Sequence, residues 1–259
     1  MAYRVDYPSL RIPLNKSLWK LLDIIFPPRC PGCGLIGERF CYDCIRQIKT
    51  IDKDFCLKCG MVIDNNFYHE LTICEPQFEH LLMIRSFSLY KPPISMAIKN
   101  FKYHRDFGIS DILANFLVEL YNKNKMDIDM VIPVPLNPKR IKERGYNQSH
   151  LLALPFSLKI NKPINKQSLR RSKETRPQVG LNRNERLLNV SEAFVADPQQ
   201  VKGMNILLID DVTTTGATLE ACASALKLAG ANDIVGFTLA RAVPTQNGYS
   251  DDLIETASV

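Results

Sequence analysis

Seven of the eight cysteines in this chain lie between Cys30 and Cys74. A pair of thiolates separated by two residues can hold one ion from a tight turn, and two such pairs complete the tetrahedron that zinc prefers. A disulfide framework is the alternative, but such frameworks suit secreted chains, and nothing in the sequence indicates secretion. The spacing therefore predicts zinc binding by three pairs and one further thiol: Cys30 and Cys33, Cys41 and Cys44, Cys56 and Cys59, and Cys74.

The first two pairs supply four ligands for one zinc ion, whereas the third pair and Cys74 supply only three. His69 or His80 could provide the fourth ligand, or the second site is empty. Gly34 and Gly60 each follow a pair, at positions where a positive φ is commonly needed. The eighth cysteine, Cys222, lies among small helix-forming residues and is interpreted as a packed core thiol.

Two adjacent carboxylates, Asp210 and Asp211, follow the apolar run Ile-Leu-Leu-Ile and precede a loop rich in threonine. We expect both side chains at the carboxyl end of a strand, outside the core, where open α/β sheets bind ligands. Successive backbone N–H groups at the start of a helix can surround a phosphate, and the carboxylates suit ribose hydroxyls. The Walker pattern is absent. A plain strand–turn–helix with threonine caps is the alternative, but it gives the two carboxylates no purpose.

Positive charge is concentrated in residues 134–186, which contain 13 Lys or Arg and 3 Asp or Glu, although the whole chain has a net charge of only +6. This segment is suited to anions, and phosphates are the expected ones, either free or in nucleic acid. Tyr146 and Tyr103 are available for base stacking. A solvated charged loop is the alternative. The candidate contacts to single-stranded nucleic acid are Arg140, Lys142, Arg144 and Arg176.

A smaller basic cluster around Tyr103 is interpreted as a helix end and not as a separate site. Its members are Lys99, Lys102, Tyr103, His104 and Arg105.

The elements that must position these residues alternate along the chain. Apolar runs predict strands over residues 81–89, 130–134, 205–209 and 234–240. Helical periodicity predicts helices over 18–26, 92–99, 109–122, 148–158 and 218–228, and residues 170–184 are expected to form a loop. This alternation indicates an α/β fold with a mainly parallel, Rossmann-like sheet.

The composition limits the classes of protein to which the chain can belong. The chain has 259 residues, of which 46% are hydrophobic and 23% are charged, and this is typical of one or two globular domains. No apolar run approaches the roughly 18–20 residues that a membrane helix needs, and the N-terminus lacks the features of a signal peptide. We therefore expect an intracellular protein without a membrane span.

The segment from Ile206 to Thr218 closely resembles the phosphoribosyl-pyrophosphate (PRPP) motif of type I phosphoribosyltransferases. With the cysteine-rich start, the chain is similar over residues 18–242 to the ComF family, also called ComFC or GntX-like. This family combines a double zinc ribbon with a phosphoribosyltransferase domain. Its often-present fourth cysteine pair is missing here, because Cys74 is followed three residues later by Gln77. The other matching positions are Pro133-Val134-Pro135, Arg140, Arg144-Gly145-Tyr146-Asn147-Gln148, Arg176-Pro177-Gln178, Leu181, Arg186, Asn189 and Ala193-Phe194.

The resemblance implies a role for each motif residue. Asp210 and Asp211 would be catalytic and would hold the ribose hydroxyls of PRPP, and a loop carrying Lys139 and Arg140 would face the pyrophosphate. Mg²⁺ would accompany PRPP with few protein ligands. Residues 170–183 would form a flap over the pocket, where their arginines would neutralise the departing pyrophosphate. The 5′-phosphate would be held by Thr214, Thr215, Gly216, Ala217 and Thr218.

The predicted organisation is an N-terminal segment with an amphipathic helix (1–28), a zinc ribbon (29–80), a phosphoribosyltransferase-like domain (81–245) and a polar tail (246–259). The resemblance implies a cytoplasmic protein that handles single-stranded DNA during natural transformation. It would work with a DEAD-box-type translocase and recombination mediators. A working phosphoribosyltransferase acting on a nucleobase or related acceptor is the second hypothesis. A sensor of PRPP or nucleotides is the third.

Overall fold

The structure is a computed structural model, and it describes residues 27–63, 74, 77–104, 106–171 and 193–243. At its centre is a four-stranded parallel sheet in the order β1-β6-β5-β2. Strands β5 and β6 begin with uninterrupted apolar runs that are buried, as expected for a parallel sheet covered on both faces. The strands are β1 (Met83–Leu89), β2 (Met130–Pro133), β5 (Ile206–Thr213) and β6 (Ile234–Arg241).

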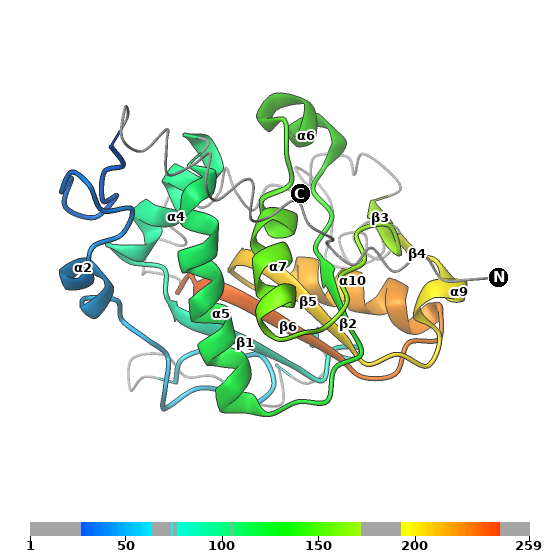
Figure 1. Ribbon diagram of the computed structural model, residues 1–259. Coiled ribbons are helices and arrows are strands. Elements are labelled where there is room, and N and C mark those ends of the chain that lie inside the picture. Colours follow the sequence, from blue (N-terminus) through cyan, green and yellow to red (C-terminus); the bar gives the residue numbers. More distant parts are fainter. Residues whose placement is uncertain (1–26, 64–73, 75–76, 105, 172–192, 244–259) are drawn as a thin grey trace, which may run out of the picture.

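Helices cover both faces of this sheet (Figure 1). One face packs against α4 (Ile94–Tyr103), α5 (Ser110–Asn124) and α7 (Gln148–Lys159). The other face packs against α10 (Ala217–Leu228), which also contacts an antiparallel pair of short strands, β3 (Leu169–Arg171) and β4 (Phe194–Ala196). The short helices are α2 (Tyr42–Arg46), η1 (Phe107–Ile109), α6 (Pro138–Arg144) and α9 (Pro198–Val201).

All four predicted strands are present, as are the predicted helices after residue 90, and the parallel α/β sheet is confirmed. The predicted helix at 18–26 and residues 172–184 of the predicted loop lie outside the described residues, whereas Arg170 and Arg171 belong to β3 and not to a loop. The segment with Lys139 and Arg140, expected to be a loop, is instead the helix α6. Asn137 accepts a hydrogen bond from the N–H of Lys139, Pro138 occupies the first turn, and Gly145 ends the helix with φ 83°.

The cysteine-rich segment pairs with the free edge of β1. Thr50 bridges Ser88 in antiparallel fashion, and the N–H of Ile51 donates to the carbonyl oxygen of Phe87 at 3.0 Å. Further along the same strand, the N–H of Ile84 donates to the carbonyl oxygen of Lys58 at 2.8 Å. Covering an edge in this way satisfies backbone groups that would otherwise be open to pairing with another chain.

The two groups of cysteines join different cores. Cys30, Cys41 and Cys44 are buried with apolar residues of α4 and α5 on one side of the sheet. Cys56, Cys59 and Cys74 are buried with residues of α10 on the other side. The cysteine-rich segment therefore reaches around the β1 edge and contributes to the cores on both faces.

Candidate functional site

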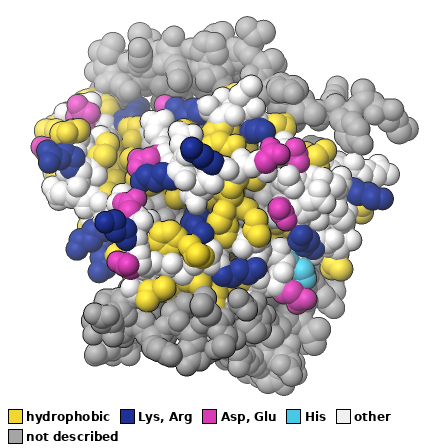
Figure 2. All heavy atoms as spheres, turned by 90° about the horizontal axis from the view of Figure 1, so that it is seen from below, with side chains coloured by type: hydrophobic (Ala, Val, Ile, Leu, Met, Phe, Trp, Pro, Cys, Tyr) yellow, Lys and Arg dark blue, Asp and Glu magenta, His cyan; other side chains and the backbone are white. Residues whose placement is uncertain are grey.

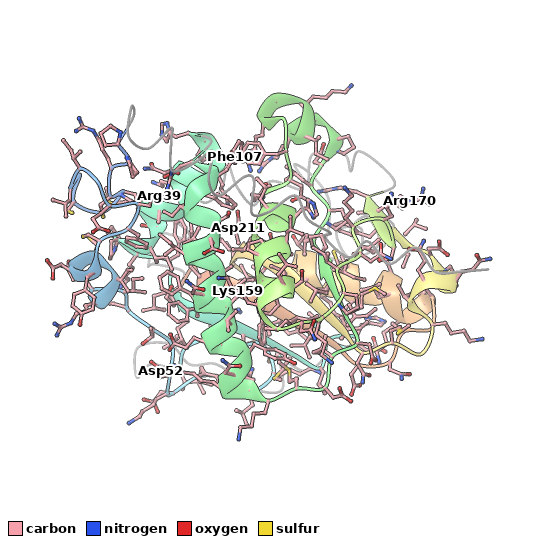
Figure 3. The ribbon with its side chains drawn as sticks, in the orientation of Figure 1. Arg39, Asp52, Phe107, Lys159, Arg170 and Asp211 are labelled. Carbon is pink, nitrogen blue, oxygen red and sulfur yellow. The ribbon has the colours of Figure 1, made fainter. Side chains whose placement is uncertain are left out.

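The carboxylate pair lies near the carboxyl end of β5, where Asp210 pairs in register with Thr238 of β6. Asp210 is half-buried, but Asp211 is only 3% exposed. The expectation that both side chains lie outside the core is therefore wrong for Asp211. In Figure 3, the label of Asp211 stands between α5 and α7.

Asp211 is buried because it has a counter-charge. The ammonium of Lys102, near the end of α4, lies 3.0 Å from Asp211 Oδ2, and both side chains are 4% exposed. Lys102 was expected only to belong to a basic helix end, and its long-range partner changes that interpretation. A buried ion pair is costly to desolvate and adds little to stability by itself, so its presence beside a ligand site favours a functional role.

Asp210 is held by α7. Its Oδ1 accepts hydrogen bonds from the hydroxyl of Ser149 at 2.8 Å and from the N–H of Asp211 at 2.9 Å. Burial and the neighbouring charge of Asp211 raise the pKa of Asp210 to about 7, against the opposing effects of Ser149 and Lys102. The two adjacent carboxylates are thus different chemically: Asp211 is paired with a cation, and Asp210 can change its protonation near neutral pH.

The loop after β5 leads directly into α10, as the motif predicts. Residue Gly216 has φ 87°, and its position leaves no room for a side chain. A Cβ here would lie 2.7 Å from Phe78 and 2.8 Å from Ile84, so Phe78 and strand β1 both support this loop. The N–H of Ala217 donates to the hydroxyl of Thr215 at 3.3 Å. With Thr214 and Thr218 on either side, this turn opens a 12-residue helix, which is the geometry that favours a phosphate.

Helix α6 projects from the molecule at the end of β2 (Figure 1), and it carries the predicted basic residues Lys139, Arg140, Lys142 and Arg144. The amide of Asn147, at the start of α7, donates to the carbonyl oxygen of Val134 at 2.9 Å and so fixes the connection on either side of α6. Figure 2 shows the face seen from below, where the described charges of both signs are mixed among hydrophobic side chains. The fourth predicted residue, Arg176, lies outside the described residues.

The two tyrosines considered for base stacking have different environments. Tyr146 packs edge-on against Phe107, with ring centroids 4.8 Å apart. Its hydroxyl lies 2.7 Å and 2.9 Å from the carbonyl oxygens of Phe101 and Lys102, so it anchors the end of α4. Tyr103 is half-exposed, and Arg144 lies over its ring.

The first four cysteines converge on one point. The sulfur atoms of Cys30, Cys33, Cys41 and Cys44 all lie within 4.8 Å of one another, and those of Cys33 and Cys41 are 3.5 Å apart. A disulfide needs about 2.05 Å, whereas the thiolates of one zinc tetrahedron lie about 3.8 Å apart. Burial alone would raise the pKa of Cys30, but backbone N–H groups of its neighbours lower it to about 6. These residues therefore fit a structural zinc ion.

The second group is Cys56, Cys59 and Cys74, whose sulfur atoms also lie within 4.8 Å of one another. Residue His80, considered as a fourth ligand, is not in this group: its Nδ1 lies 2.7 Å from Glu220 Oε1 on α10. The other candidate, His69, lies outside the described residues. Beside the group, the buried Arg85 donates to the carbonyl oxygens of Leu57 and Ile84, both at 2.8 Å. Gly34 and Gly60 have the predicted positive φ, 78° and 71°.

Sequence reasoning missed Lys102, Ser149 and Phe78 as parts of the site. Phe78 follows the last of the clustered cysteines. Ser149 directly follows the motif Arg144-Gly145-Tyr146-Asn147-Gln148 but was not included in it. A signal was available for Ser149, because a serine two residues after a capping asparagine lies in the first turn of its helix. For Lys102 and Phe78 there was none, because their partners are distant in the sequence.

Residues 21–76 match the family of the double zinc ribbon domain. The chain is 31% identical over 227 residues to competence protein F of Haemophilus influenzae, covering 83% of this chain and 97% of that protein. It is 30% identical to competence protein ComFC of Bacillus subtilis, covering 86% and 89%. It is 31% identical to the DNA utilization protein YhgH of Salmonella typhimurium, covering 89% and 94%.

Among solved structures, the allosteric regulatory enzyme of purine biosynthesis shares 16% identity at a TM-score of 0.39, covering 59% of this chain and 31% of that one. The purine phosphoribosyltransferase of Pyrococcus horikoshii shares 17% identity at a TM-score of 0.29, covering 55% and 87%. Within the described residues, no helix combines the length and the apolar character that crossing a membrane requires. The predicted α/β fold with an N-terminal zinc ribbon is confirmed.

Proposed function

Because the chain belongs to the ComF family of competence proteins, we propose that it handles single-stranded DNA during natural transformation. We also propose that it holds PRPP, or a related phosphate ligand, at the carboxyl edge of its sheet. The observation that carries the proposal is the convergence at that edge of the carboxylate pair, the opening of α10 and the basic helix α6. The name of the YhgH relative, a DNA utilization protein, supports the choice of DNA. A DEAD-box-type translocase and a recombination mediator are the partners in this proposal.

Each part of the pocket has a proposed role. Asp210 accepts the ribose hydroxyls, because it is the less buried of the two aspartates and, among the described residues, has no cation paired with it. Asp211 acts as a positioning residue, because its ion pair with the buried Lys102 holds the end of α4 against β5. The turn of residues 214–218 receives the 5′-phosphate, and Lys139 and Arg140 face the pyrophosphate.

The described residues at this edge suit Mg²⁺ that binds together with the ligand, and they do not form a separate magnesium site. Lys102 already lies against Asp211, so Asp210 is the carboxylate suited to an ion that keeps few protein ligands. When bound with PRPP, Mg²⁺ would neutralise part of the negative charge of the pyrophosphate.

A second candidate function, a working phosphoribosyltransferase, is favoured by one specific observation. The pKa of Asp210 is raised to about 7 by burial and by the charge of Asp211, so this group can accept a proton at neutral pH. Incubation of the purified protein with PRPP, Mg²⁺ and a panel of nucleobases, with pyrophosphate release as the readout, tests this activity.

The DNA proposal is tested by the salt dependence of binding to a fluorescent single-stranded oligonucleotide. Each phosphate contact contributes a slope of about −0.7 in a plot of log affinity against log salt. The quadruple variant Arg140→Ala, Lys142→Ala, Arg144→Ala and Arg176→Ala should therefore flatten the slope by up to about 3 and weaken binding to all sequences alike. A matched variant removes four exposed lysines outside residues 134–186, at Lys49, Lys53, Lys125 and Lys202, and should leave the slope nearly unchanged.

The outcomes separate the hypotheses. Equal slopes in the two quadruple variants would place DNA binding away from α6 and contradict the proposal. Competition by PRPP would indicate that DNA phosphates use the same pocket. Absence of DNA binding at low salt together with PRPP turnover would replace the DNA proposal with the transferase one. Absence of both would favour a sensor of PRPP or nucleotides.

A further inference from the structure

We propose that Tyr103 and Arg144 form a platform that stacks a nucleobase at the rim of the carboxylate site. The ligand chemistry is the flat face of a purine or pyrimidine, supplied either by single-stranded DNA or by a free nucleotide. The platform deepens the proposed function and rests on it for the choice of nucleic acid. Contacts among α4, α6, α7 and β5 define the position of the platform.

The two residues end two different helices. Tyr103 is the last residue of α4, and Arg144 is the last residue of α6. The guanidinium carbon of Arg144 lies 5.0 Å from the centroid of the Tyr103 ring, and Nη2 lies 3.4 Å from the tyrosine hydroxyl. Although Arg144 covers one side of this ring, Tyr103 is still 50% exposed, so much of the ring remains open to a ligand.

The platform is linked to the carboxylates from two directions. Tyr103 directly follows Lys102, whose ammonium is paired with Asp211. On the other side, Nη1 of Arg144 donates to Gln148 Oε1 at 3.3 Å, and the next residue, Ser149, donates to Asp210. The contacts thus form a closed ring through β5, α4, α6 and α7, with the platform and the carboxylate pair as two of its members.

Neighbouring groups keep the platform in place. The hydroxyl of Tyr146 binds the carbonyl oxygens of Phe101 and Lys102, which fixes the backbone immediately before Tyr103. The hydroxyl of Tyr146 is engaged in hydrogen bonds and its ring packs against Phe107. Of the two tyrosines, Tyr103 is therefore the one available for stacking.

An exposed tyrosine with an arginine over it is not by itself a binding site. Tyr42 and Arg46 on α2 form a similar pair, with the guanidinium carbon 5.6 Å from the ring centroid and Tyr42 70% exposed. What distinguishes Tyr103 and Arg144 is the basic helix α6 that presents the arginine and the link to a site suited to phosphate and ribose. A nucleotide has its base, sugar and phosphate joined in one molecule, so a base platform beside a ribose-phosphate site matches its chemistry. Stacking on aromatic rings and on guanidinium groups tolerates any base.

The experiment compares oligo-dT with an abasic deoxyribose-phosphate oligomer of equal length, using the full chain and fluorescence anisotropy. Tyr103→Ala should weaken binding to oligo-dT about tenfold, leave binding to the abasic oligomer unchanged and leave the salt slope unchanged. Tyr103→Phe, which keeps the ring, should bind oligo-dT like the wild type. Tyr42→Ala is the matched control, and it should change neither affinity. A second arm measures binding of AMP and of ribose 5-phosphate, in which Tyr103→Ala should weaken only AMP.

The two arms of the experiment distinguish single-stranded DNA from a free nucleotide as the source of the base. They also distinguish failure of the platform from failure of the DNA-binding proposal. A loss confined to oligo-dT assigns the platform to single strands, and a loss confined to AMP assigns it to free nucleotides. If the wild type binds oligo-dT and the abasic oligomer equally and Tyr103→Ala changes neither oligo-dT nor AMP binding, the platform is overturned while DNA binding stands. If the wild type binds neither oligonucleotide and neither small ligand, the platform and the DNA proposal are both overturned.

Discussion

At the level of single residues, the pair of Lys102 and Asp211 links two segments that are far apart in sequence. Both side chains are buried, and each leaves an uncompensated charge in the interior if the other is removed. The pair also separates the roles of two neighbouring aspartates that look equivalent in the sequence. Asp211 is committed to its lysine, and Asp210 remains able to meet a ligand.

Removing one member of this pair should be far more costly than removing both. We expect Lys102→Met to lower the free energy of unfolding by about 3–5 kcal/mol. The double variant Lys102→Met with Asp211→Asn should be less destabilised than the two single variants predict, because no charge is left unpaired. Urea unfolding of all four proteins measures the coupling.

The exposed pair of Lys123 and Asp52 is the matched control, because its nitrogen–oxygen distance is 2.8 Å but both side chains are 48% exposed. Lys123→Met should cost at most about 1 kcal/mol, since exposed pairs contribute little. Equal losses for Lys102→Met and Lys123→Met would contradict the prediction that burial makes the loss of one partner costly.

The raised pKa of Asp210 has a consequence for stability that depends on pH. Burial and the charge of Asp211 raise this pKa to about 7, whereas the unfolded chain has about 3.9. Between these values the folded protein binds a proton that the unfolded chain does not, so stability is lost as pH rises from about 4 to about 7. Asp210→Asn removes the titration, and its side-chain oxygen can still accept the hydrogen bond from Ser149.

We therefore expect the Tm of Asp210→Asn to match that of the wild type near pH 4 and to exceed it by about 3–8 °C at pH 8. Thermal melts across this range check the difference. Asp52→Asn is a control of opposite sign, because hydrogen bonds from Lys123 and Thr50 lower the pKa of Asp52. This variant should lose stability at pH 8 and approach the wild type at low pH. A Tm difference for Asp210→Asn that does not vary with pH would contradict the raised pKa.

At the level of elements, the sequence predicts the central strands and long helices because each is encoded locally. Ile206 to Ile209, for example, is a continuous apolar run, and it forms the buried part of β5. Helix α6 was missed because its interior has no apolar period, although Asn137, Pro138 and Gly145 mark its two ends. The pair β3 and β4 was missed because strands of 3 residues are too short to show a pattern.

The candidate site was predictable to the extent that its residues are contiguous. Asp210, Asp211 and the turn after them follow one another in the sequence, and the structure places them at one strand end. The partners that decide their chemistry are not contiguous: Lys102 comes from α4 and Ser149 from α7. Only tertiary packing brings those helices to β5, so neither the burial of Asp211 nor the pKa of Asp210 could be inferred beforehand.

At the level of the whole molecule, the cysteine-rich segment is part of the cores on both faces of the sheet, and metal binding should therefore stabilise the entire protein. Cys33 gives the sharpest test, because it is the exposed member of its group and contributes little packing. Cys33→Ser should remove about one equivalent of zinc by elemental analysis and lower the Tm of a single unfolding transition.

Cys222→Ala is the matched control, because this thiol is a buried residue of α10 and belongs to neither group of cysteines. It should retain all of its zinc. Full zinc content in Cys33→Ser would show that the first four cysteines do not share an ion. Two separate unfolding transitions in the wild type would show that the cysteine-rich segment unfolds independently of the sheet.

The strand order has a consequence for synthesis on the ribosome. Strand β6, the last strand in the described chain, lies between β1 and β5 and pairs with both. Until residues 234–241 leave the exit tunnel, the first strand has no parallel partner and the fifth has an open edge. A nascent chain therefore exposes an edge of β1 until β6 emerges, and an edge of β5 as well once β5 has been made, and such edges are prone to pair with other chains. Completion of the sheet is a long-range event that must wait for β6, so folding of this protein should be slow and should benefit from chaperones that shield unfinished sheets.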